Sequence, residues 1–303
     1  MKTAAIDGGQ CTANLIYGRT NIESLQKMNG DSVDCVVTSP PYWGLRDYGA
    51  DGQLGLEESV SDYVQQMTKT FAEIKRVLKS TGTVWLNLGD TYKNKQLMGV
   101  PWRVAFALQD DGWFLRQEII WHKPNPMPES VTDRCTKASE SIFLLAKSSS
   151  YFFDAESIKE ENAGSLPYGD KKNFKMNDNR AQGRHGKGSM FSGGSRQEYI
   201  EKYYLNGRNR RSVWTITTQP FSGAHFAVFP EEIPRLAILA GCPVGGTVLD
   251  PFSGSGTTGK MALKNGRNYI GLDINDDYFD VAERRVSPLK ADVAANDNQL
   301  EMF

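Results

Sequence analysis

Hydrophobic positions in the first half of the chain alternate between the spacing of buried strands and that of helices. Residues 32–37 (SVDCVV) predict a short buried strand, which Pro40 and Pro41 stop because proline cannot continue a hydrogen-bonded ladder. Hydrophobic side chains then recur three and four positions apart between residues 60 and 78, which predicts a helix that Gly82 ends. The same patterns predict strands at 83–88, 113–121 and 141–147 and a helix at 100–110.

Alternation of strands and helices returns near residue 229 and continues to about residue 290. Such alternation is typical of an α/β fold in which helices pack on a mostly parallel sheet. The tail at 291–303 is polar and is expected to be flexible. The elements predicted in this half are helices at 231–240, 257–265 and 276–285 and strands at 247–250 and 268–274.

The segment at 156–211 differs in character from the chain on either side. Between Lys159 and Arg211 it contains eight glycines and few aliphatic residues. Twelve Lys or Arg residues there oppose six Asp or Glu residues, a net charge of +6 that leaves −7 on the rest of a chain whose total is −1. We expect 156–211 to be an inserted, flexible region between two parts of a catalytic domain, at 1–155 and 212–290. A charged stretch is more often a solvated surface, but a nucleic-acid partner would require such local segregation of charge.

The composition is that of one large globular domain with room for a small insertion, at 303 residues with 39% hydrophobic and 23% charged residues. No apolar stretch approaches the roughly 20 residues of a membrane span, and the first residues show no signal-peptide pattern. The cysteines form no Cys-x-x-Cys pair, which predicts a reduced cytoplasmic protein without structural zinc. They are Cys11, Cys35, Cys135 and Cys242.

A strand, a glycine-rich turn and the start of a helix follow one another at 247–260. The spacing of Gly254, Gly259 and Lys260 fits the phosphate loop G-x-x-x-x-G-K. The next residue, Met261, cannot hold Mg²⁺ as the Ser or Thr hydroxyl of that loop does, so nucleotide hydrolysis is disfavoured.

The same turn also fits the dinucleotide pattern G-x-G-x-x-G, through Gly254, Gly256 and Gly259. Asp250 comes directly off the strand, where a carboxylate can meet a positively charged ligand, and Asp273 ends the next strand, where it can hold ribose hydroxyls. Either NAD or S-adenosylmethionine satisfies these positions. A purely structural alternative is a tight turn between strand and helix, with Asp250 as a helix cap.

Residues 250–258 (DPFSGSGTT) resemble the cofactor motif of the amino-methylating DNA methyltransferases, which act on cytosine N4 or adenine N6. In that family the turn lies under the methionine part of S-adenosylmethionine, and the acidic residue after the next strand, here Asp273, binds the ribose. Residues 225–230 (HFAVFP) resemble the segment that closes over the methionine; His225 is given no chemical role. The resemblance implies a Rossmann-like methyltransferase fold and S-adenosylmethionine, with no metal. It assigns cofactor binding to Asp250, Pro251, Phe252, Gly254, Gly256, Thr257, Asp273 and Phe226.

Residues 38–43 (TSPPYW) stand at the end of the first predicted strand. Their simplest interpretation is a rigid turn with an aromatic contact. Amino methylation, however, needs two acceptors at the hydrogens of an exocyclic NH₂, because the nitrogen lone pair is delocalised into the base. Ser39 and the carbonyl of Pro40 can supply them, and Pro40 and Pro41 stiffen the loop that aims them. The base must be flipped out of the duplex, and Tyr42, helped by Trp43, can stack against it. The sulfonium charge can rest near Phe252.

The same family carries [Ser/Asp/Asn]-Pro-Pro-[Tyr/Phe/Trp] at this place, so the resemblance makes Ser39, Pro40, Pro41 and Tyr42 the catalytic residues. In the family, Ser at the first position goes mostly with cytosine N4 and Asp with adenine N6. Physical chemistry alone does not give that preference, because the two amino groups are chemically alike. The sequence therefore favours cytosine N4 and leaves adenine N6 open.

The catalytic segment precedes the cofactor segment, an order that resembles the β group, a circular permutation of the usual methyltransferase sheet. Residues 119–128 and 139–147 resemble its central segments, although Ser139 stands where relatives often have His before Glu. By the same analogy, 156–211 is the target-recognition region. The implied partner is double-stranded DNA, with no membrane; a companion restriction enzyme, and a monomer or a homodimer, stay open. The candidate DNA-binding residues are Arg184, Lys187, Arg208, Arg210 and Arg211.

Two other classes of protein remain as alternatives. A non-catalytic DNA-binding protein on a methyltransferase scaffold is disfavoured because both the catalytic and the cofactor motif are intact. A nicotinamide enzyme leaves residues 39–43 and the basic insertion unexplained.

Overall fold

The computed structural model describes residues 1–7, 9–161, 207–218 and 229–287. Two compact units are distinguished: residues 1–154 with the chain from 212 onward, and residues 155–211. No helix within the described ranges is long and apolar enough to cross a membrane.

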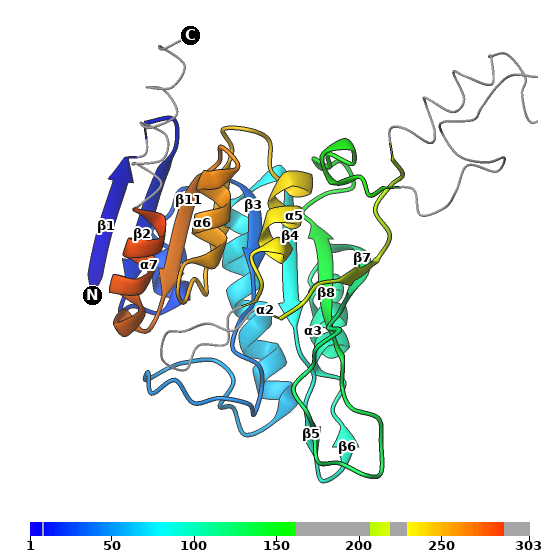
Figure 1. Ribbon diagram of the computed structural model, residues 1–303. Helices are drawn as coiled ribbons and strands as arrows, with labels where there is room; N and C mark the ends of the chain where they lie inside the picture. Colours follow the sequence, from blue (N-terminus) through cyan, green and yellow to red (C-terminus); the bar gives the residue numbers. More distant parts are fainter. Residues whose placement is uncertain (8, 162–206, 219–228, 288–303) are drawn as a thin grey trace, which may run out of the picture. The chain divides into compact units, whose positions relative to one another are not determined.

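The first unit is built on a nine-stranded sheet in the order β1-β2-β11-β10-β3-β4-β8-β7-β9 (Figure 1). The five strands from β2 to β4 run parallel, β1 and β8 are antiparallel to their neighbours, and β9 is parallel to β7. This confirms the predicted α/β class with a mixed, mostly parallel sheet. The strands are β1 Lys2–Asp7, β2 Thr12–Tyr17, β3 Val33–Thr38, β4 Leu78–Leu88, β7 Phe114–His122, β8 Ser139–Ala146, β9 Val213–Thr215, β10 Thr247–Asp250 and β11 Asn268–Asp273.

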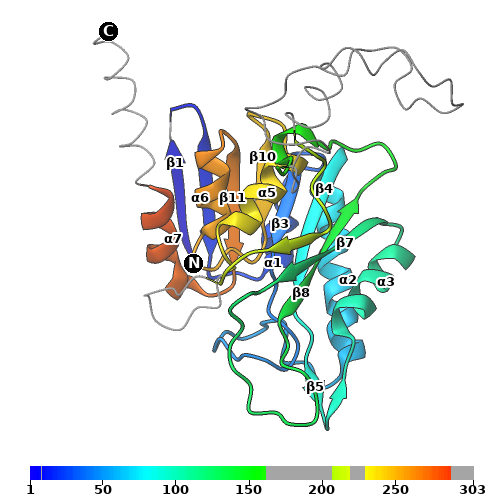
Figure 2. The ribbon, with the colours of Figure 1, turned by 45° about the vertical axis from the view of Figure 1, so that its right-hand side comes forward.

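Helices cover both faces of this sheet (Figures 1 and 2). Helices α5, α6 and α7 pack side by side on one face, and α1, α2 and α3 pack together on the other. A short hairpin, β5 Tyr92–Lys93 with β6 Gln96–Leu97, stands apart from the sheet. The helices are α1 Asn21–Leu25, α2 Val60–Val77, α3 Val100–Asp110, α5 Glu232–Gly241, α6 Thr257–Lys264 and α7 Phe279–Val286.

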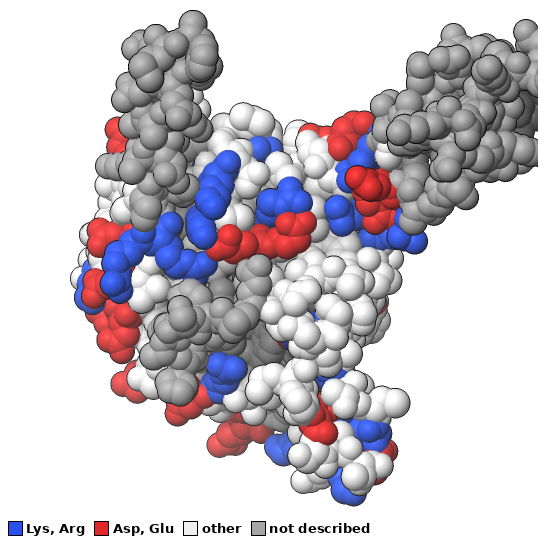
Figure 3. Space-filling model, viewed as in Figure 1, with Lys and Arg blue, Asp and Glu red and all other residues white. Residues whose placement is uncertain are grey.

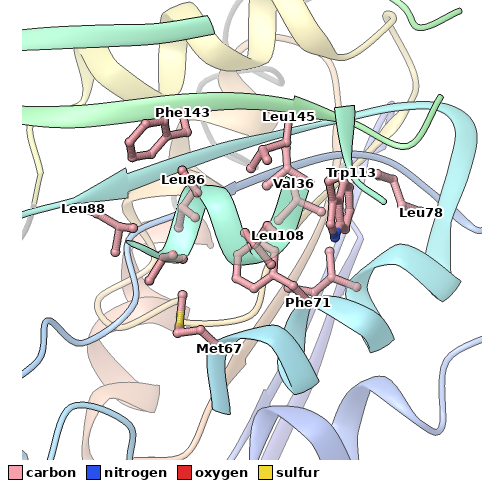
Figure 4. Packing of buried hydrophobic residues seen from close by; sticks show 14 of the residues in the cluster. Val36, Met67, Phe71, Leu78, Leu86, Leu88, Leu108, Trp113, Phe143 and Leu145 are labelled. Atoms are coloured by element: carbon pink, nitrogen blue, oxygen red, sulfur yellow. The ribbon is translucent and has the colours of Figure 1, made fainter. Parts of the chain in front are cut away.

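The core beneath α2 and α3 explains why residues 60–77 form a helix. Ser59 caps the helix by accepting a hydrogen bond from the Asp62 amide (3.2 Å). The large hydrophobic residues of α2 recur three and four positions apart, and most of them lie on its buried face. Met67 and Phe71 face side chains of α3 and of the sheet (Figure 4). Those shown beside them include Val36, Leu86, Leu88, Leu108, Trp113, Phe143 and Leu145.

The prediction that Gly82 ends this helix is wrong. The helix ends at Val77, and Leu78 is already extended and pairs with Val33 at the start of β4. Gly82 lies within β4, where a Cβ would come 2.5 Å from the Leu78 side chain. Here glycine serves close packing inside a strand and does not cap the helix.

The order of the parallel strands places the ligand site. The chain passes from β3 through α2 to β4, and from β10 through α6 to β11, in opposite directions across the sheet. The strand order therefore reverses between β3 and β10. Ligands of such sheets bind at this switch point, outside the carboxyl ends of the strands.

The second unit contains a short 3₁₀ helix, Glu156–Ile158, and a bridge in which Glu160 and Arg208 exchange backbone hydrogen bonds. Glu160 also accepts hydrogen bonds from the side chains of Arg208 (2.9 Å) and Arg211 (2.6 Å). The Arg210 side chain donates to the Ile158 carbonyl (2.8 Å).

Candidate active site

A cavity of about 660 Å³ lies at the carboxyl ends of the central strands. That size is within the usual range for small-molecule and cofactor sites. Residues from both sequence motifs line it, although the motifs lie more than 200 positions apart. The predicted site residues among its walls are Ser39, Pro41, Asp250, Phe252, Gly254, Thr257 and Asp273.

Asp273, at the end of β11, holds the glycine turn through its carboxylate. One carboxylate oxygen of Asp273 accepts a hydrogen bond from the Gly254 amide (2.7 Å), and the other accepts one from the Asn275 amide (2.9 Å). Gly254 and Gly256 have φ of 48° and 77°, a left-handed backbone that other residues rarely adopt. Burial raises the pKa of Asp273 to about 6.

Two buried tyrosines, from β2 and β11, also hold the turn by hydrogen bonds. The Ser253 hydroxyl lies 2.7 Å from the Tyr17 hydroxyl and 2.8 Å from that of Tyr269, and Tyr17 also donates to the Gly254 carbonyl (2.9 Å). Gly259 leaves room for the Tyr269 ring, since a Cβ there would lie 2.5 Å from it. The turn is therefore fixed by hydrogen bonds with Asp273 and with the two tyrosines, all of them within the protein.

Asp250 connects β3, which precedes the Ser-Pro-Pro-Tyr segment, to α6, which follows the glycine turn. One oxygen of its buried carboxylate accepts hydrogen bonds from the Thr38 hydroxyl (2.7 Å) and the Phe252 amide (3.0 Å), and the other accepts one from the Thr258 hydroxyl (2.7 Å). Burial raises its pKa to about 6. Asp250 is thus a hub between β3, β10 and α6. It does not cap α6, whose N-cap residue is Gly256 and which has no side-chain cap hydrogen bond.

The walls of the cavity fit the expected S-adenosylmethionine. Asp273 offers a carboxylate at one end, and aromatic side chains offer apolar surface. The Asn21 side chain also lines the cavity, and its Nδ2 is a buried donor with no partner among the described residues. Because an unpaired buried donor costs about 1–3 kcal/mol, this atom suits an acceptor on a bound nucleoside. The aromatic residues are Tyr48, Phe229, Phe252 and Tyr278.

At the end of the cavity formed by the Ser-Pro-Pro-Tyr segment, Ser39 belongs to a cluster of four polar side chains. Its hydroxyl lies 3.1 Å from the Tyr42 hydroxyl and 3.3 Å from Asn87 Nδ2. Tyr42 donates to Glu140 (2.7 Å), and Asn87 Nδ2 donates to Tyr42 (2.7 Å) and to Glu140 (2.9 Å). Lys123 forms an ion pair with the other oxygen of Glu140. Burial, and next the negative charge of Glu140, raise the pKa of Tyr42 well above its ordinary value.

The Pro-Pro-Tyr segment is positioned by close packing. The Tyr63 hydroxyl of α2 donates to the Pro41 carbonyl (2.9 Å). The Tyr42 ring lies against Gly89, where a Cβ would come 2.5 Å from the ring. Pro41 faces the cavity, whereas Pro40 is buried and Tyr42 is half-buried. Stacking of a base on Tyr42 stays a prediction.

Pro251, directly after β10, is buried and is not among the residues that line the cavity. The other predicted residues divide into two groups. Phe226, Arg184 and Lys187 lie outside the described residues. Arg208, Arg210 and Arg211 belong to the second unit, where each has the protein partner given above. On the face shown in Figure 3, Lys and Arg side chains lie among Asp and Glu side chains over α5, α6 and α7.

Several residues of the site are not singled out by the sequence motifs. Asn87 comes from β4, where a polar residue inside a hydrophobic strand is the only signal. Glu140 lies near the start of β8, in a segment that resembles a central segment of the family but is given no role. Thr38 borders the Ser-Pro-Pro-Tyr segment and Thr258 ends the glycine motif, but their shared contact with Asp250 requires the fold. Asn21 stands in a short helix, α1, that the hydrophobic pattern does not predict.

Comparison with known proteins gives one consistent result. The model of the N6/N4 DNA methylase family matches residues 33–284. The type II methyltransferase M.SmaI of Serratia marcescens is 42% identical over 293 residues, which cover 87% of each chain. The solved cytosine-N4-specific PvuII DNA methyltransferase covers 92% of this chain and 91% of its own, with 17% identity and a TM-score of 0.66. A putative DNA modification methylase of Thermus thermophilus, complexed with S-adenosyl-L-methionine, covers 91% and 95%, with 21% identity and a TM-score of 0.56.

These matches agree with the geometry of the cavity. The solved structures share the fold, which confirms the Rossmann-like methyltransferase sheet expected from the motifs. The family match covers most of the chain, including both the Ser-Pro-Pro-Tyr and the glycine-rich segments. Together with the identity to M.SmaI, it shows that this chain belongs to the N6/N4 DNA methylase family.

Proposed function

We propose that this protein transfers a methyl group from S-adenosylmethionine to the exocyclic amino nitrogen of a base flipped out of duplex DNA, with cytosine N4 as the target atom. One observation carries the proposal. Ser39, Asp250 and Asp273 line a single cavity, so a cofactor held at the glycine turn lies in the same cavity as the proposed catalytic serine.

The cofactor assignment is supported by residues of both motifs. Asp273, whose oxygens each accept one backbone hydrogen bond, keeps lone pairs for ribose hydroxyls. Asn21 Nδ2 offers a donor that no residue of the described ranges engages, and Phe252 offers an aromatic face near which a sulfonium can rest. S-adenosylmethionine, when bound, supplies the activated methyl group. The related structure from Thermus thermophilus is a complex with the same compound.

The protein contributes mainly by positioning. Ser39 accepts a hydrogen bond from the amino group, and the carbonyl of Pro40 accepts the second one. Together they draw the nitrogen toward a tetrahedral geometry in which its lone pair can attack the methyl carbon. No covalent intermediate between enzyme and base is needed.

Cytosine N4 is proposed over adenine N6 because position 39 is Ser, the residue that goes mostly with cytosine targets in this family. The fold match to the cytosine-N4-specific PvuII enzyme is in line with this choice. Double-stranded DNA is the proposed partner, with Arg184, Lys187, Arg208, Arg210 and Arg211 as phosphate and base contacts. The type II relative M.SmaI suggests a companion restriction enzyme.

Transfer of labelled methyl from S-adenosylmethionine to unmodified duplex DNA tests the proposal. Ser39→Ala should lose much of the transfer rate and keep cofactor affinity, because it removes an acceptor used mainly in the transition state. Asp273→Ala should instead weaken cofactor binding. Transfer by neither the wild type nor any variant, with no cofactor binding, would favour a non-catalytic DNA-binding protein.

A further inference from the structure

The cluster around Ser39 has a defined direction of hydrogen bonding. Glu140 is paired with Lys123 and only 13% exposed, so it is a carboxylate that can only accept. Tyr42 has one hydrogen, and the 2.7 Å contact assigns it to Glu140. The 3.1 Å contact between Ser39 and Tyr42 is therefore donated by Ser39.

This direction leaves a lone pair of Ser39 for the substrate. The hydroxyl hydrogen of Ser39 points to Tyr42, and its oxygen has two lone pairs, of which Asn87 Nδ2 occupies at most one (3.3 Å). Asn87 Nδ2 must face this cluster, because the reverse orientation would set its oxygen 2.9 Å from the Glu140 carboxylate. Its Oδ1 is buried and has no hydrogen-bond partner within the described chain. A buried polar atom without a partner is unfavourable and is found mostly at functional sites.

We propose that Glu140 is a positioning residue for Ser39 and the terminal proton acceptor of the chain Ser39–Tyr42–Glu140. The inference rests on the proposed amino methylation. As the N–C bond forms, the C–S bond breaks with its electron pair on sulfur, and the amino nitrogen becomes positively charged. It loses a proton to the Ser39 oxygen while Ser39 passes its own to Tyr42 and Tyr42 passes its own to Glu140. Glu140 becomes a neutral carboxylic acid and later releases the proton to solvent.

The surrounding groups suit this relay. Tyr42 keeps its hydrogen at neutral pH, since its pKa is raised by burial and by Glu140. Both hydrogen bonds of the chain are formed without substrate, so no side chain has to move. Lys123 holds Glu140 in place through an ion pair with its second oxygen.

The experiment measures single-turnover transfer of labelled methyl to unmodified genomic duplex DNA, with S-adenosylmethionine affinity measured in parallel. Glu140→Gln should lower the transfer rate by about 10- to 100-fold, a loss at or below the low end of what general acid–base catalysis contributes to enzyme rates. Its affinity for S-adenosylmethionine should stay within about threefold of the wild-type value. Glu118→Gln is the matched control, because Glu118 also accepts a serine hydroxyl (Ser141, 2.7 Å) but lies outside the cluster. It should keep the wild-type rate.

A double-mutant cycle separates the relay from a merely structural role. In the Ser39→Ala background, Glu140→Gln should cost less than about threefold, because Glu140 acts through Ser39. If Glu140→Gln is poorly folded, Tyr42→Phe takes its place in the cycle. This substitution keeps the ring, removes the hydroxyl that links Ser39 to Glu140, and should show the same non-additivity. Full transfer by Glu140→Gln, or additive losses in the cycle, would overturn the inference. Absence of transfer by the wild type would instead overturn the proposed function.

Discussion

The Thr38 hydroxyl donates a 2.7 Å hydrogen bond to the carboxylate of Asp250, a residue 212 positions later in the chain. Thr38 directly precedes Ser39, the proposed catalytic residue, and Asp250 begins the glycine-rich turn that is proposed to bind the cofactor. Both lie at the carboxyl ends of adjacent parallel strands, β3 and β10. A single buried hydrogen bond thus fixes the distance between the residue proposed to hold the base and the turn proposed to hold the methyl donor.

Thr38→Val should reduce the free energy of unfolding by about 1.5–3 kcal/mol, since it removes one partner of a buried carboxylate without changing side-chain volume much. Urea denaturation measures this loss. Thr68→Val is the control: Thr68 donates to the Val64 carbonyl within α2 and lies partly exposed, so the change should be within about 0.5 kcal/mol. Equal effects of both substitutions would contradict the role given to Asp250.

Cofactor affinity should depend on pH through Asp273. Its pKa in the free protein is about 6 because it is buried, and only the ionised form accepts from two ribose hydroxyls as well as two amides. Binding should therefore favour the ionised form, be strongest above about pH 6, and weaken by up to about tenfold per pH unit below it. Isothermal titration calorimetry from pH 5 to 8 measures this. Asp273→Asn should bind more weakly with a flatter profile; a profile as steep as that of the wild type would assign the titration elsewhere.

Gly89→Ala should slow methyl transfer by about 10- to 100-fold and leave cofactor affinity almost unchanged. The added Cβ would come 2.5 Å from the Tyr42 ring and displace it from the cluster around Ser39. Single-turnover rates and calorimetry provide the two readouts. Gly30→Ala serves as a control, because its nearest contact would be an ordinary 3.5 Å from the Arg76 carbonyl. Wild-type transfer by Gly89→Ala would show that the position of Tyr42 is not critical.

Arg211→Ala should weaken DNA binding and lower the salt slope of the binding constant by about one, if Arg211 neutralises one phosphate. Its side chain is 65% exposed and shares Glu160 with Arg208. Binding to duplex DNA at several salt concentrations gives the slope. Arg116→Ala, on β7 and beside Tyr151, is the comparison and should leave the slope unchanged. An unchanged slope for Arg211→Ala would remove it from the DNA contacts.

Much of the fold follows from local pattern. The helix at 100–110 and the strand at 247–250 coincide with α3 and β10. The helix has hydrophobic residues at helical spacing after Gly99, and the strand is a short apolar run between Gly246 and the glycine-rich turn. The predicted helix at 276–285 is instead a 3₁₀ turn, Asp276–Tyr278, followed by α7. The edge strand β1 has mostly exposed residues, so its pairing with β2 leaves no alternating signal.

The site divides in the same way. Ser39 and Asp273 are predictable because short, stiff motifs hold them at strand ends. Glu140 and Asn87 become part of the site only when β4 pairs with β8, and Asn21 only when α1 reaches the cavity. Such contacts depend on long-range strand order, which a single sequence does not encode in any local pattern.

The central claim, methylation of an exocyclic amino group, is tested most directly by identifying the methylated base. Unmodified duplex DNA is incubated with the protein and labelled S-adenosylmethionine, digested to nucleosides and analysed by mass spectrometry. We predict the label in N4-methylcytosine, with much less product from Ser39→Ala. Label only in N6-methyladenine would contradict the choice of cytosine, and label in 5-methylcytosine or in no nucleoside would contradict amino methylation itself.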